Sequence, residues 1–255
     1  MTIALLDYDG FICKSYYACI ARNVDDFDEM LNVLNDLESA AINKIDDLTE
    51  VKRVISGHSW KKDIYPTYKL GRKRDENLGA YREYVKFRLE DKLTCVPQLE
   101  ADEVLVMMYH HFDGEAVVFS DDKDLRYYCP VYCKINITEE VSVEDEYLYE
   151  QIEQLLAGDS EDGIIGIPKV GMVTARKLLD IKGKHNIETV IQIYKEKGIG
   201  LDECIKNLVL TIPMYELYVD NYKYDLSDSG TMNNILGQCR FISNKVKEIY
   251  ELKES

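Results

Sequence analysis

The chain has 255 residues, of which 46% are hydrophobic, and a formal net charge of −16. That length can bury a core as one α/β domain or as a domain with a helical lobe, and no apolar run approaches the roughly 20 residues of a membrane span. The N-terminal residues MTIALLDYDG contain no basic leader, so we expect neither a signal peptide nor a membrane partner.

The first elements are a strand, a helix and a second strand. Residues 3–7 form an apolar run that ends at acids, which predicts a buried strand delivering Asp7 to its carboxyl end. Apolar residues at helical spacing predict a helix from Asp28 to about Glu50. Residues 51–56 predict the second strand, and the glycines and proline of residues 57–75 predict a loop or mobile segment.

A basic band crosses the next part of the chain. Residues 61–92 hold ten basic and six acidic side chains, and residues 76–93 predict a polar, basic helix. Because the Debye length is about 8–10 Å in physiological salt, a basic band on an acidic body is compatible with phosphate binding. A solvated charged helix without a ligand is the alternative.

The remaining elements alternate and then become helical. A helix is predicted at 100–112, a strand and short helix within 115–125, another strand near 131–136, and a helix at 143–157 that Gly158 caps. This order predicts an α/β fold with a central, mainly parallel sheet flanked by helices, followed by a helical C-terminal lobe. We therefore assign residues 1–142 to an α/β core that includes the basic segment 57–93, and residues 143–255 to the helical lobe.

Seven cysteines occur without a CxxC pair. Cys129 and Cys133 could form half of a zinc site, but no second Cys/His pair stands at ligand spacing. We interpret all seven as free thiols and expect a reducing cytoplasm.

Eight carboxylates stand where a predicted strand ends or a predicted helix begins. They are Asp7, Glu100, Asp102, Glu103, Asp122, Asp124, Asp159 and Asp162. Acids at helix N-termini are ordinary caps, but the carboxyl ends of parallel strands share one edge of a sheet, where ligands bind. Acids gathered there repel one another unless cations lie between them, and all-oxygen ligands favour Mg²⁺ or Mn²⁺. Two such ions about 4 Å apart can activate water at a phosphodiester.

Five segments in order resemble the 5′-nuclease family, which includes flap endonucleases, bacteriophage 5′→3′ exonucleases and the 5′-nuclease domain of bacterial DNA polymerase I. The resemblance runs from Ile3 to about Asp180. The segments are ALLDYDGFICKSYYA (4–18), WKKDIYPTYKLGRK (60–73), LEADEV (99–104), FSDDKDL (119–125) and LLAGDSEDGIIGIPKVGMVTARKLL (155–179). Within the last, GIPKVG (166–171) is similar to a helix-hairpin-helix signature, which places that motif at 158–181.

The resemblance implies a PIN-like core and a monomeric, metal-dependent nuclease that cuts DNA at or near a 5′ end, nick or flap, or RNA in RNA–DNA hybrids. It implies two Mg²⁺ or Mn²⁺ ions on the eight carboxylates. Asp7, Glu100, Asp102 and Asp122 would hold the inner ion, and Asp124, Asp159 and Asp162 would hold or orient the second. Lys69 and Arg72 would act on the scissile phosphate. The nucleic-acid contacts would be Lys14, Lys61, Tyr68, Lys73, Arg74, Gly166, Lys169 and Gly171, with K⁺ at the hairpin. The composition is rich in Lys, Asn, Tyr and Ile and poor in Pro, as in proteins encoded by AT-rich genomes. We therefore expect a phage replication or recombination enzyme in the host cytoplasm.

The chain departs from the family at the end of the second strand. Members often carry a further metal-binding aspartate there, whereas this chain has ISGH (55–58), which puts Ser56 or His58 in its place. Glu103 also replaces an aspartate. The first departure puts the strength of one metal site in doubt.

Two other functions remain as alternatives. LLDYDG (5–10) and GDSED (158–162) resemble motifs of haloacid-dehalogenase-type phosphatases, in which Asp7 would be the nucleophile and Asp9 its acid/base partner. That hypothesis requires a strand before GDSED, where the sequence predicts a helix. The second alternative is a catalytically inactive DNA-binding protein on the same scaffold.

Overall fold

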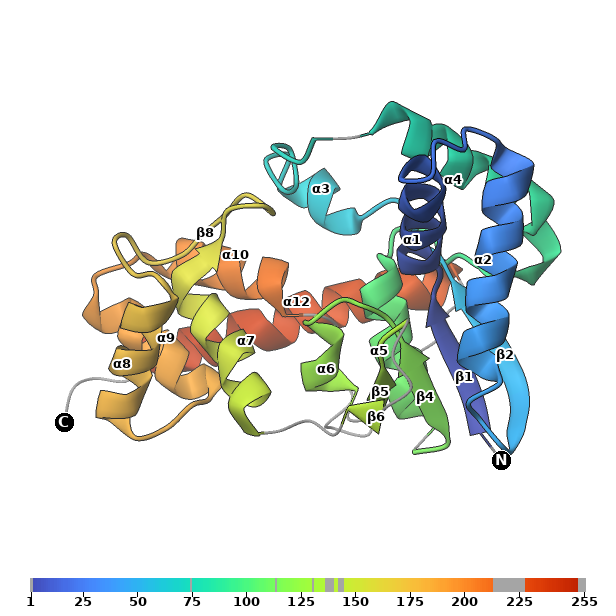
Figure 1. The fold of residues 1–255 in the computed structure, drawn as a ribbon. Helices are drawn as coiled ribbons and strands as arrows, with labels where there is room; N and C mark the ends of the chain where they lie inside the picture. The colour runs from blue at the N-terminus through green and yellow to red at the C-terminus, as the bar shows by residue number, and fades with distance from the viewer. Residues whose placement is uncertain are drawn as a thin grey trace. The chain divides into compact units, whose positions relative to one another are not determined.

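The structure is a computed structural model that describes residues 2–73, 75–112, 114–129, 131–135, 140–141, 145–212 and 228–251 (Figure 1). The chain forms two compact units. The first contains residues 1–59, 73–142 and 226–228, and the second contains residues 60–72, 143–225 and 229–255. The sequence analysis placed the whole of 57–93 in the first part, whereas 60–72 group with the second unit. Every helix in the described ranges is too short or too polar to cross a bilayer.

The first unit is built on a six-stranded sheet in the order β3-β2-β1-β4-β5-β6. The first five strands pair in parallel and only the β5–β6 pair is antiparallel. The strands are β1 (Thr2–Asp7), β2 (Leu48–Val54), β3 (Leu93–Thr94), β4 (Ala116–Phe119), β5 (Tyr132–Cys133) and β6 (Glu140–Val141). The predicted mainly parallel sheet is confirmed, and the antiparallel edge strand is an addition to it.

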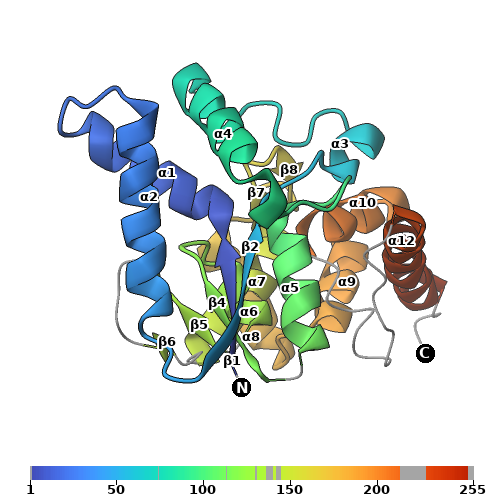
Figure 2. The same ribbon diagram turned by 90° about the vertical axis from the view of Figure 1, so that its right-hand side faces the viewer.

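Helices cover both faces of this sheet (Figure 2). They are α1 (Tyr8–Ile20), α2 (Phe27–Ile42), α4 (Glu76–Arg88), the 3₁₀ turn η1 (Glu90–Lys92), α5 (Ala101–His111) and α6 (Leu125–Tyr128). Alternate residues of the central strands, among them Ala4, Leu6 and Phe119, pack with α1, α2 and α4 in one buried cluster. The opposite face meets α5, whose residues 103–109 are all buried, as expected for a sheet covered on both sides.

In this unit one helix was not predicted and another was predicted too long. No helix was predicted directly after Asp7, but α1 begins there. Its buried residues share one face, whereas the apolar Tyr17 and Ile20 are exposed and the polar Ser15 is buried, so the contrast between its two faces is weak. The predicted helix from Asp28 to Glu50 ends at Ile42, because residues 48–54 form β2 beside β1. Ile45 and Leu48 follow the helical spacing, but Ile45 lies in the turn after α2 and Leu48 begins β2.

The second unit is helical around the buried helix α7. Its elements are α3 (Trp60–Ile64), α7 (Asp145–Ala157), the hairpin strands β7 (Gly158–Asp159) and β8 (Ile164–Ile165), α8 (Met172–Lys182), α9 (Ile187–Glu196), α10 (Leu201–Thr211) and α12 (Asp228–Glu251). Tyr194 of α9 donates its hydroxyl to the Leu155 carbonyl of α7 at 2.8 Å, and Arg176 of α8 pairs with the buried Glu153 of α7 at 2.6 Å. The predicted helical C-terminal region is confirmed, and the short β7–β8 hairpin is an addition to it.

Candidate active site

Three neighbouring strands of the first unit end at the same edge of the sheet. Asp7 at the end of β1 lies in register with Val54 at the end of β2, and Leu6 lies in register with Phe119 at the end of β4. The residues that follow, Ser56 and Ser120, therefore meet Asp7 at this edge. Parallel strands bring these segments together although 113 positions separate Asp7 from Ser120.

Ser120 joins two of the predicted carboxylates. Its hydroxyl donates to Asp7 Oδ2 at 2.5 Å and accepts the Asp122 N–H at 3.0 Å, and the Asp124 N–H in turn donates to Asp122 Oδ1 at 2.9 Å. The Tyr132 hydroxyl donates to the Ser120 carbonyl and holds this turn from β5. The sequence analysis missed Ser120, although a serine directly between a buried strand and an aspartate pair was the available signal.

The surroundings of Asp7 disfavour its negative charge. Its pKa is raised from 3.8 to about 7, first by burial and then by the charges of Asp9 and Asp122, while the hydrogen bond from Ser120 acts in the opposite direction. The carboxylate thus lies where a cation would relieve both desolvation and repulsion.

The predicted acids of α5 stand at its first turn. Glu100 is the N-cap and is 8% exposed, and its N–H donates to Glu103 Oε2 at 3.1 Å, as in a capping box. Asp102 Oδ1 accepts the Glu103 N–H at 2.9 Å. Glu103 is fully buried with one carboxylate oxygen on a backbone amide, so it stabilises the helix start, and its role as a metal ligand stays a prediction.

The candidate ligand atoms at this edge are of the type that a hard divalent cation prefers. They are oxygens throughout, without His or Cys, which favours Mg²⁺ or Mn²⁺. Within the part of the chain that the structure describes, no three Asp, Glu, His or Cys side chains lie together so as to enclose a metal ion. Asp7 and Asp122 are near enough for the charge of Asp122 to raise the pKa of Asp7.

The acids of the second unit have different partners. Asp159 Oδ1 accepts the N–H groups of Glu161 and Asp162 at 2.9 and 3.3 Å, and its Oδ2 accepts from Gln154 at 2.9 Å. Asp162 pairs with the Arg72 guanidinium, its carboxylate lies 3.9 Å from Lys69 Nζ, and its carbonyl accepts the Lys69 N–H at 2.8 Å.

Backbone packing supports the contact between these two loops. Gly163 has a φ of +71°, and a Cβ placed there would lie 2.7 Å from the Thr67 carbonyl oxygen. Only glycine combines this conformation with so close an approach. The basic loop and the acidic loop of the second unit therefore form one charge-compensated structure.

The aromatic residues of the basic segment are buried. Tyr68 is 3% exposed and packs with Ile164 and Leu210, and Trp60 is 4% exposed. Lys61 is also 3% exposed, with its ammonium 5.7 Å from the centroid of the Tyr68 ring. We expected Tyr68 and Lys61 to face a nucleic acid in a mobile segment. In this conformation they pack inside the second unit instead, because Tyr68 fills a hydrophobic cluster and Lys61 lies against its ring.

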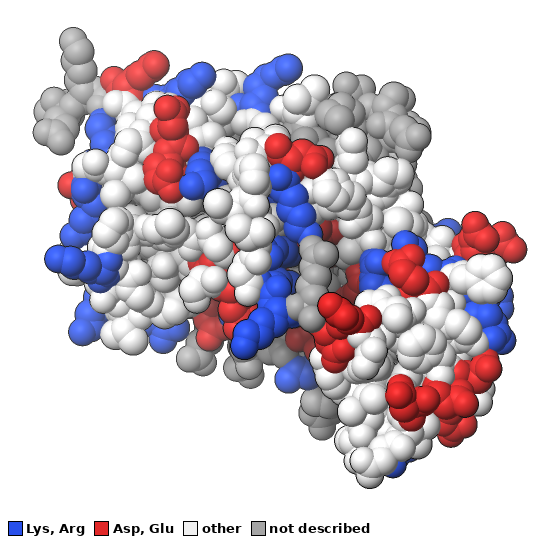
Figure 3. Space-filling view, turned by 90° about the horizontal axis from the view of Figure 1, so that it is seen from above, with Lys and Arg blue, Asp and Glu red and all other residues white. Residues whose placement is uncertain are grey.

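Much of the basic band is paired with acids. Arg82 pairs with Asp9, Arg88 with Asp28 and Lys86 with Glu83. Lys14, the basic residue of the first motif, pairs with Asp121 at 2.7 Å. Lys73 is exposed, and Arg74 lies outside the described residues. On the face shown in Figure 3, basic and acidic side chains are intermixed and do not form separate surfaces.

The GIPKVG segment runs from β8 into α8. A Cβ on Gly166 would lie 2.3–2.4 Å from backbone atoms of residues 156–158, so packing against the end of α7 requires this glycine, and its approach to a phosphate stays a prediction. Gly171 is the N-cap of α8 and has open space around it, and Lys169 is exposed with a φ of +64°. The exposed N-terminus of α8 keeps the geometry that favours an anion.

Ser56, one of the two residues that stand in place of the missing strand-end aspartate, is hydrogen-bonded to Asp9. The Ser56 N–H donates to Asp9 Oδ2 at 2.8 Å, whereas His58 is exposed. Asp9 was given a role only in the phosphatase hypothesis. That hypothesis also needs a strand before GDSED, but helix α7 ends at Ala157, directly before it.

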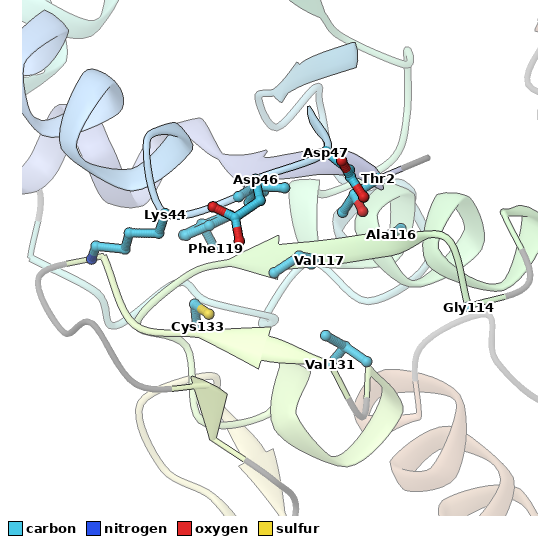
Figure 4. A pocket seen from close by; sticks show the side chains of 11 residues that line it. Thr2, Lys44, Asp46, Asp47, Gly114, Ala116, Val117, Phe119, Val131 and Cys133 are labelled. Atoms are coloured by element: carbon cyan, nitrogen blue, oxygen red, sulfur yellow. The ribbon is translucent and has the colours of Figure 1, made fainter. Parts of the chain in front are cut away.

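A cavity of about 750 Å³ lies elsewhere on the first unit (Figure 4). It runs along β4 and β5 and is bordered by Thr2, Lys44, Asp46 and Asp47. The residues that line it, in the described part of the chain, include none of the predicted site residues. The candidate site is therefore the carboxyl edge of the sheet, where ligands of parallel sheets bind, and not this cavity.

Comparison with known proteins finds one relative that is similar in sequence and several solved structures that are similar in fold. An exodeoxyribonuclease of Enterobacteria phage T3 is 27% identical over 160 residues, which cover 58% of this chain and 52% of that relative. The chain resembles the phage 5′-exonucleases. The match thus spans about half the length of this curated relative, and no protein-family model matches the chain.

Solved structures of a bacteriophage T5 nuclease share the fold over nearly the whole chain. The T5 flap endonuclease in a pseudo-enzyme-product complex with DNA and metal ions has a TM-score of 0.61 at 16% identity, covering 99% of this chain and 100% of its own. The T5 5′-exonuclease with bound zinc has a TM-score of 0.59 at 14% identity, covering 98% and 100%. At these identities the likeness shows the fold, and the predicted α/β architecture with a helical C-terminal region agrees with it.

Proposed function

We propose that this chain is a divalent-metal-dependent 5′-nuclease that hydrolyses DNA phosphodiesters at or near a 5′ end, nick or flap, in phage DNA replication or recombination. One observation carries the proposal. In a chain that resembles phage 5′-exonucleases, Asp7 at the end of β1 and the Asp122 turn after β4 share hydrogen bonds with Ser120, and the pKa of Asp7 is raised to about 7.

The residues have separate roles in this mechanism. Asp7, Glu100, Asp102 and Asp122 would hold one Mg²⁺ or Mn²⁺ ion of the first unit, and Asp159 and Asp162 would hold a second ion. Bound divalent ions lower the pKa of a water and stabilise the leaving oxygen. Ser120 keeps Asp7 and the Asp122 turn in place through its two hydrogen bonds. Lys69 and Arg72 contact the phosphate, the arginine with two parallel hydrogen bonds and the lysine as a point charge.

Binding of the duplex is proposed to be independent of sequence. The α8 N-terminus and the preceding GIPKVG turn offer backbone amides and Lys169 to phosphates, with K⁺ at residues 158–181 as in a helix-hairpin-helix motif. Contacts to phosphates alone position a protein without reading bases. RNA in RNA–DNA hybrids is included as a substrate class, and a monomer is sufficient for this mode of binding.

The test uses a 5′-labelled flapped duplex and a matched nicked duplex, each with Mg²⁺ and with EDTA. We expect label release with Mg²⁺ only, and loss of release in Asp102→Ala. Release that persists with EDTA or in Asp102→Ala would contradict the metal mechanism. Binding without cleavage at saturating Mg²⁺ would identify an inactive DNA-binding protein. Hydrolysis of a small phosphate ester that Asp9→Asn abolishes would identify a phosphatase.

A further inference from the structure

An ion pair between α1 and α4 is hydrogen-bonded to the backbone of Ser56, shortly after the end of β2. Arg82 of α4 donates from Nε to Asp9 Oδ1 of α1 at 2.7 Å. Arg82 Nη2 also donates to the Ser56 carbonyl at 2.6 Å, and the Ser56 N–H donates to Asp9 Oδ2 at 2.8 Å. The pair therefore satisfies both backbone groups of Ser56, which the strand ladder no longer reaches.

The same backbone segment holds the entry to α5. The Ser56 hydroxyl accepts the Ala101 N–H at 3.0 Å, and the Gly57 N–H donates to the Leu99 carbonyl at 2.8 Å. A Cβ on Gly57 would lie 2.5 Å from the Val96 carbonyl oxygen, so the chain before α5 packs directly on this backbone. The contacts run without a break from Arg82 and Asp9, through Ser56, to the first residue of α5.

We propose that Arg82 and Asp9 are positioning residues that fix the acidic start of α5 at the carboxyl edge of the sheet. This inference rests on the proposed nuclease function. Arg82 belongs to the basic band, whose charge is compatible with phosphate binding, but its guanidinium donates to Asp9 and to the Ser56 carbonyl. Its side chain is 27% exposed and that of Asp9 is 28% exposed. Both carboxylate oxygens of Asp9 are engaged, one by Arg82 and one by Ser56, which is the pattern of a structural carboxylate.

The variants are Arg82→Gln, Arg82→Lys, Asp9→Asn and the double variant Arg82→Gln/Asp9→Asn. Arg88→Gln is the matched control, because Arg88 lies on the same helix and pairs with the exposed Asp28. We expect Arg82→Gln to lower kcat on a 5′-flapped duplex by about 10- to 100-fold while KM changes less than about threefold, the pattern of an effect on chemistry and not on binding. Arg82→Lys should not restore kcat, because lysine lacks the planar fork that reaches Asp9 and the Ser56 carbonyl together. The control should behave as wild type.

A phosphate contact predicts the opposite results. If Arg82 binds DNA, Arg82→Gln raises KM, reduces the slope of log affinity against log salt by about one, and is partly rescued by lysine. Any of these results would overturn the positioning role.

Urea unfolding separates failure of this inference from failure of the proposed function, because it needs no activity. In a double-mutant cycle we expect the double variant to shift the midpoint by less than the sum of the two single shifts, since the side chains act as one unit. Additive shifts would overturn the inference even if the nuclease is active. If the variants show coupled shifts but the wild-type protein cleaves no substrate, the ion pair is supported and the nuclease assignment is refuted.

Discussion

The acids of the two units are held in opposite ways. Asp7 at the sheet edge of the first unit receives neutral donors from Ser120 and Gly10 and lies near two further acids. Asp162 in the second unit is compensated by Arg72 and Lys69 of the same unit. The first arrangement favours an added cation, and the second already has its cations. The difference separates the site where a metal ion is most needed from the site where a substrate phosphate would compete with the Asp162 carboxylate for Arg72 and Lys69.

Loss of a sheet-edge acid should have the largest effect. We expect Asp7→Asn to lower single-turnover cleavage of a flapped duplex by about 10³-fold or more, because one metal ligand and its charge are removed. Asp162→Asn should lower it less, by about 10- to 100-fold, since Arg72 and Lys69 remain. Asp46→Asn is the control, because Asp46 borders the separate cavity. Equal losses for Asp7→Asn and Asp162→Asn would remove the distinction between the two acids.

The cations of the second unit should matter next. Arg72→Gln should lower single-turnover cleavage by about 100-fold, because a charged donor to the phosphate is lost as negative charge develops. Arg72→Lys should retain part of the rate, since it keeps the charge but not the bidentate geometry. Arg88→Gln again serves as the exposed control. If Arg72→Gln cleaves as fast as wild type, Arg72 serves only to neutralise Asp162.

The raised pKa of Asp7 predicts a pH effect in the metal-free protein. Between pH 3.8 and about 7 the folded state keeps a proton on Asp7 that the unfolded state releases, so wild type loses stability as pH rises through this window. Asn carries no charge to desolvate and does not share this loss. With EDTA present, Asp7→Asn should therefore be more stable than wild type at pH 8, by about 2–4 kcal/mol, and equal to it near pH 3.5.

Urea unfolding of both proteins at several pH values measures this difference. Asp46→Asn, which is exposed, should follow wild type across the whole range. A gap between Asp7→Asn and wild type that is constant with pH would show that the pKa of Asp7 is the same in the folded and unfolded states, which would contradict the raised value.

The sequence predicted the sheet because its signals are local. Apolar runs such as residues 3–7 and 116–119 that end at acids are buried parallel strands in the structure, and their order along the chain implies one shared edge. The placement of Asp7 beside the Asp122 turn follows from that edge. Helix α1 was missed because apolar side chains such as Tyr17 and Ile20 also stand on its exposed face while Ser15 is buried, which weakens the pattern that identifies surface helices.

The ion-pair partners of the charged residues could not be predicted from the sequence. Asp162 and Arg72 are 90 positions apart, and Asp9 and Arg82 are 73 apart, so their pairing depends on tertiary packing and not on spacing. For the same reason Tyr68 and Lys61, whose residue types suggest nucleic-acid contacts, are buried against the β7–β8 hairpin region. Residue type indicates what a side chain can bind, whereas packing decides whether it is exposed to bind it.

Disturbing the close packing between the basic and acidic loops of the second unit should have the smallest effect. Gly163→Ala combines a positive φ with a Cβ that would lie 2.7 Å from the Thr67 carbonyl oxygen, so we expect a loss of about 2–3 kcal/mol in the free energy of unfolding. Gly183→Ala is the control, because Gly183 has nearly the same φ, +68°, but nothing within 4 Å of the added Cβ, and should cost about 1 kcal/mol. Urea unfolding measures both. Equal losses would mean that the Thr67 loop moves away from Gly163 at no cost, and that the two loops are held together by the Arg72–Asp162 pair and not by close backbone packing.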